Sequence, residues 1–262
     1  MKLVVFGSRS FNNKERMWRI LDRILNENDL EIVQGDCRGA DLMAKAWAID
    51  RGVVHHDYPA DWDTHGRSAG HKRNAVMAGV ADEGLCFWDG TSPGTKGMID
   101  IMQKKGKPVD VIKYVPEVRG NLWAAHKQGS FIVITTNTQC RQDGTAIMGG
   151  GIALAAAQRY KGLDAHYGKH LRSAADPEKP VYLLKDRLIL LPTKREVHKL
   201  SPLDLVEKNI LWLKALSENH PTWRIALIPL GCGLGGLDWG TQVQPLVDEH
   251  LSNGMFTVYK ND

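Results

Sequence analysis

The stretch that decides the fold of the second half of the chain is Gly231-Cys232-Gly233-Leu234-Gly235-Gly236-Leu237-Asp238-Trp239. It follows an apolar run at residues 224–228 that predicts a buried strand, and it precedes residues 243–251, whose apolar spacing predicts an amphipathic helix. A glycine-rich loop at such a place exposes backbone N–H groups, and the helix N-terminus behind it adds a partial positive charge. The stretch therefore predicts a site that holds a diphosphate, with a tight turn that binds nothing as the alternative.

A second loop of the same kind lies at Ala146-Ile147-Met148-Gly149-Gly150-Gly151-Ile152-Ala153. It follows an apolar, β-branched strand predicted at residues 131–135, and it opens an alanine-rich helix. Two glycine loops, each after a strand, favour ligand binding over an empty turn.

Composition limits the class of protein. The chain has 262 residues, of which 43% are apolar, and this is enough to build one large domain or two ordinary ones. A formal net charge of +4, from 34 basic and 30 acidic residues, is too mild to indicate nucleic-acid binding by itself. No run of 18 apolar residues is present, and the apolar N-terminal run is too short for a signal peptide. The four cysteines form no C-x-x-C pair, so we expect neither a zinc site nor a disulfide framework, and a cytoplasmic location. No cofactor is expected either.

Strands and helices alternate along the first half. Strands are predicted at 3–6, 31–34, 53–58, 84–88 and 109–114, and helices at 14–25, 42–49, 68–77 and 96–104. Residues 59–67 are predicted as a long loop, with Ser68 as the cap of the helix that follows. This alternation predicts an α/β fold with a doubly wound parallel sheet, in which ligands bind at the carboxyl ends of the strands.

Five motifs of this half resemble the SLOG superfamily, in particular its small YspA-like branch. They are Gly7-Ser8-Arg9-x-Phe11, Gly39-Ala40-Asp41, Ala60-Asp61-Trp62, Gly70-x-x-Arg73-Asn74-x-x-Met77 and Ser92-x-Gly94-Thr95. The resemblance implies a Rossmann-like sheet that binds a nucleotide or a nucleotide-derived ligand. The residues it assigns to that ligand are Gly7, Ser8, Arg9, Gly35, Asp36, Arg38, Asp41, Asp61, Trp62, Arg73, Asn74, Gly94 and Thr95.

Within that set, Arg9, Arg38 and Arg73 are the candidate phosphate partners, because guanidinium groups match phosphate oxygens. The carboxylates of Asp36, Asp41 or Asp61 are candidates for ribose hydroxyls, and solvated loops or structural ion pairs are the alternative for every charged residue. The SLOG branch that cleaves nucleotide monophosphates has a Pro-Gly-Gly loop followed by a catalytic acid. Residues 92–95 carry no such acid, so binding is expected here rather than catalysis.

A proline and a change of pattern at residues 114–117 mark a boundary, which gives predicted domains at 1–114 and 115–262. The second half predicts a helix around Trp123, helices at 152–157, 163–174 and 203–216, a hairpin at 181–184 and 188–191, and a last strand at 255–259. Together these elements predict an α/β/α sandwich.

The second half resembles macro domains, which bind ADP-ribose. The resemblance lies in Gly120-Asn121-Leu122, Thr136-Asn137, residues 146–153, Leu191-Pro192-Thr193-Lys194 and residues 229–239. It implies that the two glycine loops grip the diphosphate and the distal ribose. The ADP-ribose-binding residues it implies are Asn121, Leu122, Thr136, Gly149, Gly150, Gly151, Ile152, Gly231, Cys232, Gly233, Leu234, Gly235 and Gly236.

The chain departs from the macro-domain pattern at the catalytic positions. Asn121 stands where most members have an aspartate that accepts from the adenine amino group. In one hydrolytic branch a lysine is expected in the first glycine loop, where this chain has Gly150, and in a related branch an aspartate is expected where it has Gly235. The remaining candidates for holding a water are Asn137, Asp143 and His170, while Cys232 is interpreted as a packing residue.

Two functions follow from the pattern. The first is an enzyme that binds and hydrolyses ADP-ribose derivatives, such as ADP-ribose 1″-phosphate or an ADP-ribosyl adduct. The second is a non-catalytic protein that senses or sequesters an NAD-derived nucleotide, for instance in phage–host conflict. Nucleic-acid handling is a third alternative, against which the mild charge argues. The expected partner is thus ADP-ribose or a related NAD-derived nucleotide. No association with a membrane is expected, and the pattern leaves open whether the chain forms a homo-oligomer.

Overall fold

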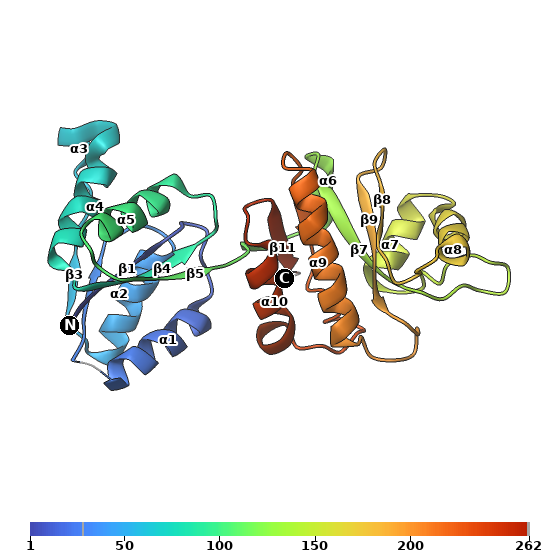
Figure 1. Ribbon diagram of the computed structural model, residues 1–262, viewed down its shortest axis with the longest axis horizontal. Coiled ribbons are helices and arrows are strands. Elements are labelled where there is room, and N and C mark those ends of the chain that lie inside the picture. Colours follow the sequence, from blue (N-terminus) through green and yellow to red (C-terminus); the bar gives the residue numbers. More distant parts are fainter. Residues whose placement is uncertain (28, 261–262) are drawn as a thin grey trace. The chain divides into compact units, whose positions relative to one another are not determined.

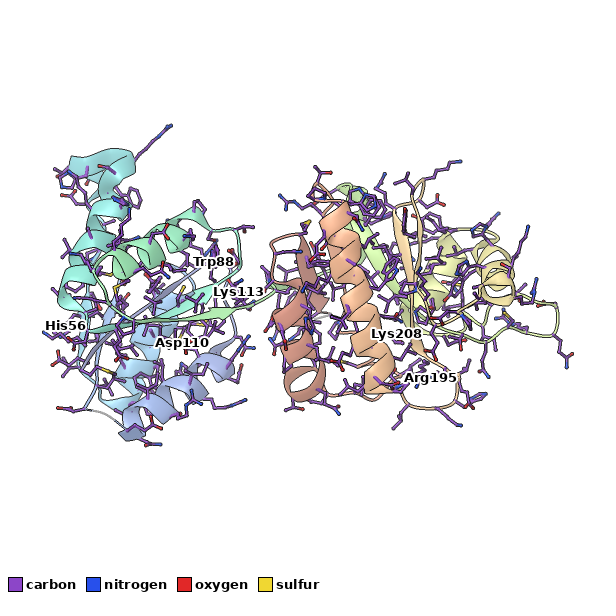
Figure 2. All side chains as sticks on the ribbon, viewed as in Figure 1. His56, Trp88, Asp110, Lys113, Arg195 and Lys208 are labelled. Atoms are coloured by element: carbon purple, nitrogen blue, oxygen red, sulfur yellow. The ribbon has the colours of Figure 1, made fainter. Side chains whose placement is uncertain are left out.

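The computed structural model describes residues 1–27 and 29–260 (Figure 1). The chain divides into two compact units, Met1–Pro116 and Glu117–Asp262. Each unit contains one sheet with helices packed against it, and side chains fill the space between sheet and helices in both (Figure 2).

The first unit is built on a five-stranded parallel sheet. Its strands are β1 (Lys2–Gly7), β2 (Glu31–Gln34), β3 (His55–Asp57), β4 (Glu83–Trp88) and β5 (Val109–Lys113), in the order β3-β2-β1-β4-β5. Every pairing is parallel. The order reverses direction beside β1, as in a doubly wound sheet, so the predicted fold class is confirmed for this unit.

Both faces of this sheet are buried, because alternate residues of each strand face opposite sides. Leu3 and Val5 of β1 pack in one core with α1 (Lys14–Glu27) and α2 (Ala40–Arg51). Val4 and Phe6 pack in another core with α4 (Ala69–Val80) and α5 (Pro93–Lys104).

Two details of this unit differ from the sequence prediction. The predicted loop at 59–67 contains the short helix α3 (Trp62–His65), which Asp61 caps by accepting from Thr64 N at 2.9 Å, and then a 3₁₀ turn, η1 (Gly66–Ser68). Ser68 does not cap α4, since its hydroxyl donates to the His65 carbonyl at 2.7 Å. Single-turn helices carry no apolar period, and so periodicity misses them.

The second unit is built on a six-stranded mixed sheet in the order β6-β11-β10-β7-β9-β8. Its strands are β6 (Glu117–Arg119), β7 (Phe131–Asn137), β8 (Val181–Leu183), β9 (Leu188–Lys194), β10 (Ile225–Leu227) and β11 (Phe256–Lys260). All pairs are parallel except β8 with β9, which form the predicted hairpin.

Helices cover both faces of this sheet (Figure 1). Ile132 and Ile134 of β7 pack with α6 (Leu122–Lys127), α7 (Gly151–Arg159) and α8 (Leu163–Ser173). The helices α9 (Leu203–Asn219) and α10 (Gln244–Leu251) contact each other, and α9 packs on β9. The predicted α/β/α sandwich is therefore confirmed.

Three features of this unit differ from the sequence prediction. Residues 117–119 form strand β6, which the sequence prediction lacks, because Val118 stands between two charged residues and gives no apolar run to detect. Strand β9 runs on to Lys194 rather than ending at residue 191. The helix after the glycine loop begins with a π-helical turn, η2 (Trp239–Val243), before α10.

Candidate functional site

The second unit has a cavity of about 340 Å³ at the carboxyl ends of β7, β9 and β10. Both predicted glycine loops line it. The lining residues are Thr135, Thr136, Asn137, Ile147, Gly149, Gly150, Gly151, Ile152, Ala153, Thr193, Lys194, Val197, Ile228, Pro229, Gly231, Gly233, Leu234 and Gly235. We call this space the C-terminal cavity.

The first glycine loop presents the uncapped start of α7. Gly150 precedes the helix and makes no side-chain cap, and Gly151 has a φ of 55°, which favours glycine. The first N–H groups of α7 are therefore left without a side-chain acceptor from the cap position. Leu234 reaches across from the other loop, because a Cβ on Gly150 would lie 2.9 Å from its Cδ1. The two loops thus meet over the cavity.

The second glycine loop has one position where no side chain fits. A Cβ on Gly235 would collide with the carbonyl oxygen of Gly231 and with the hydroxyl of Ser201, which lies buried beneath the loop. Ser201 also donates its backbone N–H to the Gly235 carbonyl at 2.8 Å. By contrast, a Cβ on Gly233 would meet nothing within 4 Å. The absence of an aspartate at 235 is therefore a steric consequence of this loop conformation.

Asn137, a predicted catalytic residue, lies at the end of β7 and lines the cavity. Its Nδ2 donates to the Ile147 carbonyl at 2.7 Å, and its Oδ1 accepts from Gln139 N at 2.9 Å. The side chain thus ties the strand end to the first glycine loop. One amide hydrogen and one oxygen lone pair are still free of these two bonds.

Several predicted residues lie outside the lining of this cavity. Asn121 caps α6 by accepting from Trp123 N at 2.9 Å, and Leu122 is buried in the core. Asp143 accepts from both the N–H and the hydroxyl of Thr145, which lowers the pKa of its carboxyl and fixes it in a turn. Among the described residues the lining also omits His170, Cys232 and Gly236.

Lys194 is the residue that the sequence reasoning missed. Among the described residues that line the cavity, Lys194 alone has an ionisable side chain. It lies at the end of β9 and not in the first glycine loop. Its Nζ donates to the Leu234 carbonyl at 2.5 Å and to the Val197 carbonyl at 3.4 Å. The signal was present in the motif Leu191-Pro192-Thr193-Lys194, but only the parallel pairing of β7 with β9 brings it beside Asn137.

The first unit has a larger cavity, of about 590 Å³, at the carboxyl ends of β1 and β4. We call it the N-terminal cavity. Of the predicted residues it is lined by Gly7, Ser8, Arg9, Asp41, Trp62, Arg73, Asn74, Gly94 and Thr95. Gly35, Asp36, Arg38 and Asp61 lie outside this lining, and Cys37, Arg67, His71 and Ser92 belong to it.

Arg73 and Asp41 organise one wall of the N-terminal cavity. The Arg73 guanidinium donates to the carbonyl of Gly35, and to that of Tyr58 at 3.3 Å. The buried Asp41 carboxylate accepts from Gly35 N at 3.1 Å. A Cβ on Gly35 would collide with the Arg73 guanidinium, so glycine lets the arginine approach the backbone. Arg73 is therefore largely engaged with the loop rather than free for a phosphate.

Three other basic side chains of this cavity have no partner in the part of the chain that the structure describes. Arg9, Arg67 and His71 line the space, and none of them takes part in an ion pair there. Thr95, in the first turn of α5, lines it as well and is only 6% exposed. The positive charges of Arg9 and Arg67, in a cavity that an uncapped helix start also lines, suit an anionic ligand.

Asp89, which no motif singled out, shapes both loops at this edge. Its carboxylate accepts from Thr91 N at 3.0 Å and Ser92 N at 2.8 Å, and its own N–H donates to Ser8 Oγ at 3.1 Å. Burial works to raise the pKa of this carboxyl, but these hydrogen bonds outweigh it and the pKa is lowered. Asp89 thus holds the Ser8 loop and the start of α5 in one arrangement.

The contribution of Asp41 to the stability of the first unit should fall as the pH rises from about 4 to 6. Burial raises the pKa of Asp41 to about 6 from an ordinary value of 3.8, although Arg73 works against that shift. Between these values the folded state binds more protons than the unfolded state, so the free energy of unfolding decreases with pH, in total by about 3 kcal/mol. Thermal unfolding of the wild type and Asp41→Asn at pH 4, 5, 6 and 7 checks this. The difference in stability between the wild type and the variant should change by about 3 kcal/mol over this range, and an equal pH dependence in both proteins would contradict the assignment.

Comparison with known proteins identifies the class to which the first unit belongs. Residues 1–65 match the family described as YAcAr: YspA, cpYpsA-related SLOG family. The chain is also 34% identical over 116 residues to the Gene 61 protein of Mycobacterium phage D29, which covers 41% of this chain and 93% of that protein. The chain therefore belongs to the family of this phage protein, and its N-terminal residues belong to the SLOG family.

Solved structures similar to this chain include a DarG macrodomain and a DarTG complex. The macrodomain of Thermus aquaticus DarG is 28% identical, with a TM-score of 0.45, over 55% of this chain and 96% of that one. Thermosipho africanus DarTG in complex with ADP-ribose is 18% identical, with a TM-score of 0.46, over 66% of this chain. The match spans about half of that DarTG chain, 51% of it.

Among the described residues, no three or more His, Cys, Asp or Glu side chains are grouped so that they could hold a metal ion. No helix in residues 1–27 and 29–260 combines the length and the apolar character needed to cross a bilayer.

Proposed function

We propose that the C-terminal cavity binds ADP-ribose derivatives and hydrolyses them at the distal ribose. The observation that carries this proposal is the meeting of two glycine loops and the Lys194 ammonium around one cavity. Backbone N–H groups and a helix start provide bonds for the diphosphate, and one cation offsets part of its charge. A space of a few hundred Å³ is also typical of small-ligand sites.

The polar groups of the cavity limit the chemistry. The described lining contains no carboxylate and no imidazole, so a water cannot be deprotonated there by a side chain of the usual kind. The unbonded amide hydrogen and lone pair of Asn137 can orient a water against the ribose. The Lys194 ammonium can stabilise negative charge that develops on a leaving oxygen. We propose these two residues, and no longer Asp143, as the hydrolytic pair.

The first unit would supply a second nucleotide site. Its support is the N-terminal cavity, where Arg9, Arg67 and His71 have no partner among the described residues and line the same space as the start of α5. Trp62, which is 52% exposed at the rim, offers a ring for a base. The four cysteines are all free thiols, which fits a reducing compartment such as the cytosol.

Removal of the cavity cation tests this proposal. We expect Lys194→Met to weaken ADP-ribose binding by about 10-fold, because one charge-assisted contact to the diphosphate is lost. Isothermal titration calorimetry gives the affinity, and Lys199→Met is the control, because Lys199 is exposed and pairs with Glu196 instead. Equal affinities of the wild type and Lys194→Met would remove the lysine from the site.

Analysis of the ligand after binding separates the enzyme from the sensor. The wild type is incubated with ADP-ribose 1″-phosphate and with an ADP-ribosylated macromolecule, and the products are separated by chromatography. Released phosphate or free ADP-ribose supports hydrolysis, and its loss in Asn137→Ala and Lys194→Met supports the two residues. Tight binding with recovery of both compounds intact would favour the alternative, a protein that senses or sequesters the nucleotide.

A further inference from the structure

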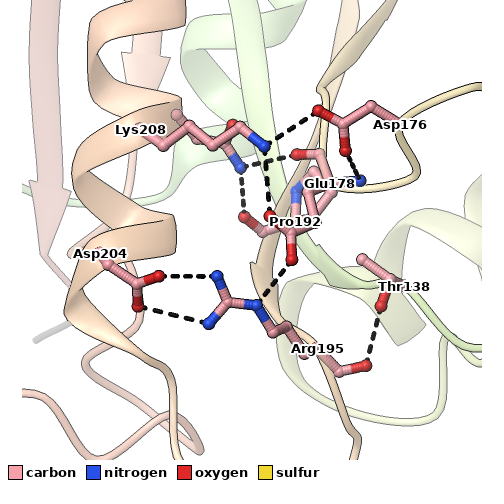
Figure 3. A network of polar contacts seen from close by, with 8 residues as sticks. Thr138, Asp176, Glu178, Pro192, Arg195, Asp204 and Lys208 are labelled. Carbon is pink, nitrogen blue, oxygen red and sulfur yellow. Dashed lines mark hydrogen bonds and ion pairs between the residues drawn. The ribbon is translucent and has the colours of Figure 1, made fainter.

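The residue after Lys194 is anchored on the side away from the C-terminal cavity. Arg195 follows the last residue of β9, and its guanidinium reaches the first turn of α9 (Figure 3). It donates to Asp204 with two nitrogens, at 2.7 and 3.3 Å, and its Nε donates to Glu178 at 2.6 Å. The bonds from Arg195 lower the pKa of both carboxyl groups, so both are ionised near neutral pH. We call Glu178, Arg195 and Asp204 the Arg195 brace.

The backbone on both sides of Lys194 is fixed to the neighbouring strand end. Thr138 donates its N–H to the Lys194 carbonyl at 3.2 Å and its hydroxyl to the Arg195 carbonyl at 2.8 Å. Further along, Val197 N donates to Gln139 Oε1 at 2.8 Å. The segment that carries Lys194 is thus held from the β7 side by hydrogen bonds and from the α9 side by the brace.

Lys208 is a second cation that binds Glu178 of the Arg195 brace, and it makes no bond to the end of β9. Lys208, one turn further along α9, donates to Asp176 at 2.9 Å and to Glu178 at 3.2 Å (Figure 3). Beside it the buried Asn209 donates to the Pro192 carbonyl at 2.7 Å. Lys208 therefore shares Glu178 with Arg195 but has no bond to residues 194–197, which makes it a matched control.

We propose that Arg195 is a positioning residue that fixes the Lys194 ammonium at the second glycine loop. The ammonium bonds the carbonyls of Leu234 and Val197, so its place depends on where the backbone of residues 194–197 lies. The brace holds that backbone from outside, through the neighbouring side chain. This inference rests on the proposed function for its binding readout, but the position of the amine can be measured without it.

Acetylation of lysines, followed by mass spectrometry, reports the position of the amine directly. The proteins are the full-length wild type, Arg195→Met and Lys208→Met, each treated briefly with an acetylating reagent well below its unfolding temperature. In Arg195→Met we expect Lys194 to be acetylated about 3-fold to 5-fold faster than in the wild type, because an amine released from two acceptors is more accessible. Lys208→Met should leave that rate unchanged, although it removes an equivalent surface ion pair.

The same proteins are then titrated with ADP-ribose. We expect about a 5-fold loss of affinity in Arg195→Met and less than 2-fold in Lys208→Met, which is the scale of one partly exposed ion-pair network. Asp204→Asn, which keeps the arginine and removes its bidentate partner, should reproduce the Arg195→Met result and replaces it if that variant does not fold.

The outcomes separate the two proposals. If the wild type fails to bind ADP-ribose, the proposed function is wrong, while the acetylation rates still test the position of the amine. If Lys194 is acetylated at the same rate in all three proteins, Arg195 does not position it and the inference fails. An equal rise of the Lys194 acetylation rate in Arg195→Met and Lys208→Met would also overturn it, because the effect would then be a general loosening of the structure around Glu178.

Discussion

Gly233→Glu should abolish ADP-ribose binding, with a loss of at least about 100-fold, or about 2.7 kcal/mol. Gly233 lines the C-terminal cavity at the centre of the second glycine loop, and a Cβ there meets no atom within 4 Å. The Cβ of the glutamate therefore causes no clash, and we expect the fold to be kept. Its carboxylate would occupy the diphosphate position and repel the ligand, in a space that offers Lys194 as its cation.

The control for this variant is Gly79→Glu, in α4 of the first unit, where an added Cβ also meets nothing within 4 Å. Both variants should keep the melting temperature of the wild type within about 2 °C, since neither creates a clash. Calorimetry should then show lost binding in Gly233→Glu alone. Unchanged affinity in that variant would move ADP-ribose binding out of the C-terminal cavity, and the N-terminal cavity would be the next to examine.

The second large effect is on stability. Gly235→Ala should destabilise the second unit by about 3 kcal/mol, because its Cβ would overlap the Gly231 carbonyl and the Ser201 hydroxyl, and the carbonyl belongs to the backbone. For a unit of this size we expect a melting temperature lower by about 6–12 °C, measured by scanning calorimetry.

The matched substitution is Gly233→Ala, two residues earlier in the same loop, where the same methyl group finds open space. It should change the melting temperature by no more than about 2 °C. A second comparison, Gly235→Ala with Ser201→Gly, should recover only part of the loss, because it removes the hydroxyl but not the carbonyl. Equal melting temperatures for the two alanine variants would show that the loop relaxes freely around Gly235.

The sequence was sufficient for the fold because apolar strands and amphipathic helices alternate regularly in both units. The parallel sheets, the hairpin of β8 and β9 and the helix α9 all carry strong apolar patterns, and the structure confirms them. The elements that were missed, α3 and β6, are four and three residues long. Such pieces are fixed by their surroundings: Asp61 caps the first, and pairing with β11 forms the second.

The site was less predictable, because it depends on which hydrogen-bond partners each polar side chain finds in the folded protein. Asn121 and Asp61 belong to motifs, yet both serve as helix caps, and Arg73 binds backbone carbonyls instead of facing solvent. The motif Leu191-Pro192-Thr193-Lys194 gave no sign that its lysine belongs to the site, because strand pairing and not local spacing brings Lys194 to the glycine loops. Local spacing identifies the loops, but only tertiary contacts reveal which charges reach them.

The crowding at Gly235 also restricts the mutational routes open to this loop. An acidic residue there could not be acquired in one step, since the Gly231 carbonyl and the Ser201 hydroxyl already occupy its space. A change at 201 alone would leave the carbonyl in place, so the loop backbone would have to be rebuilt as well. A loop with glycine at this position and a loop with a carboxylate therefore need different backbone conformations. A sequence that changed residue 235 before the backbone had changed would encode an unstable protein.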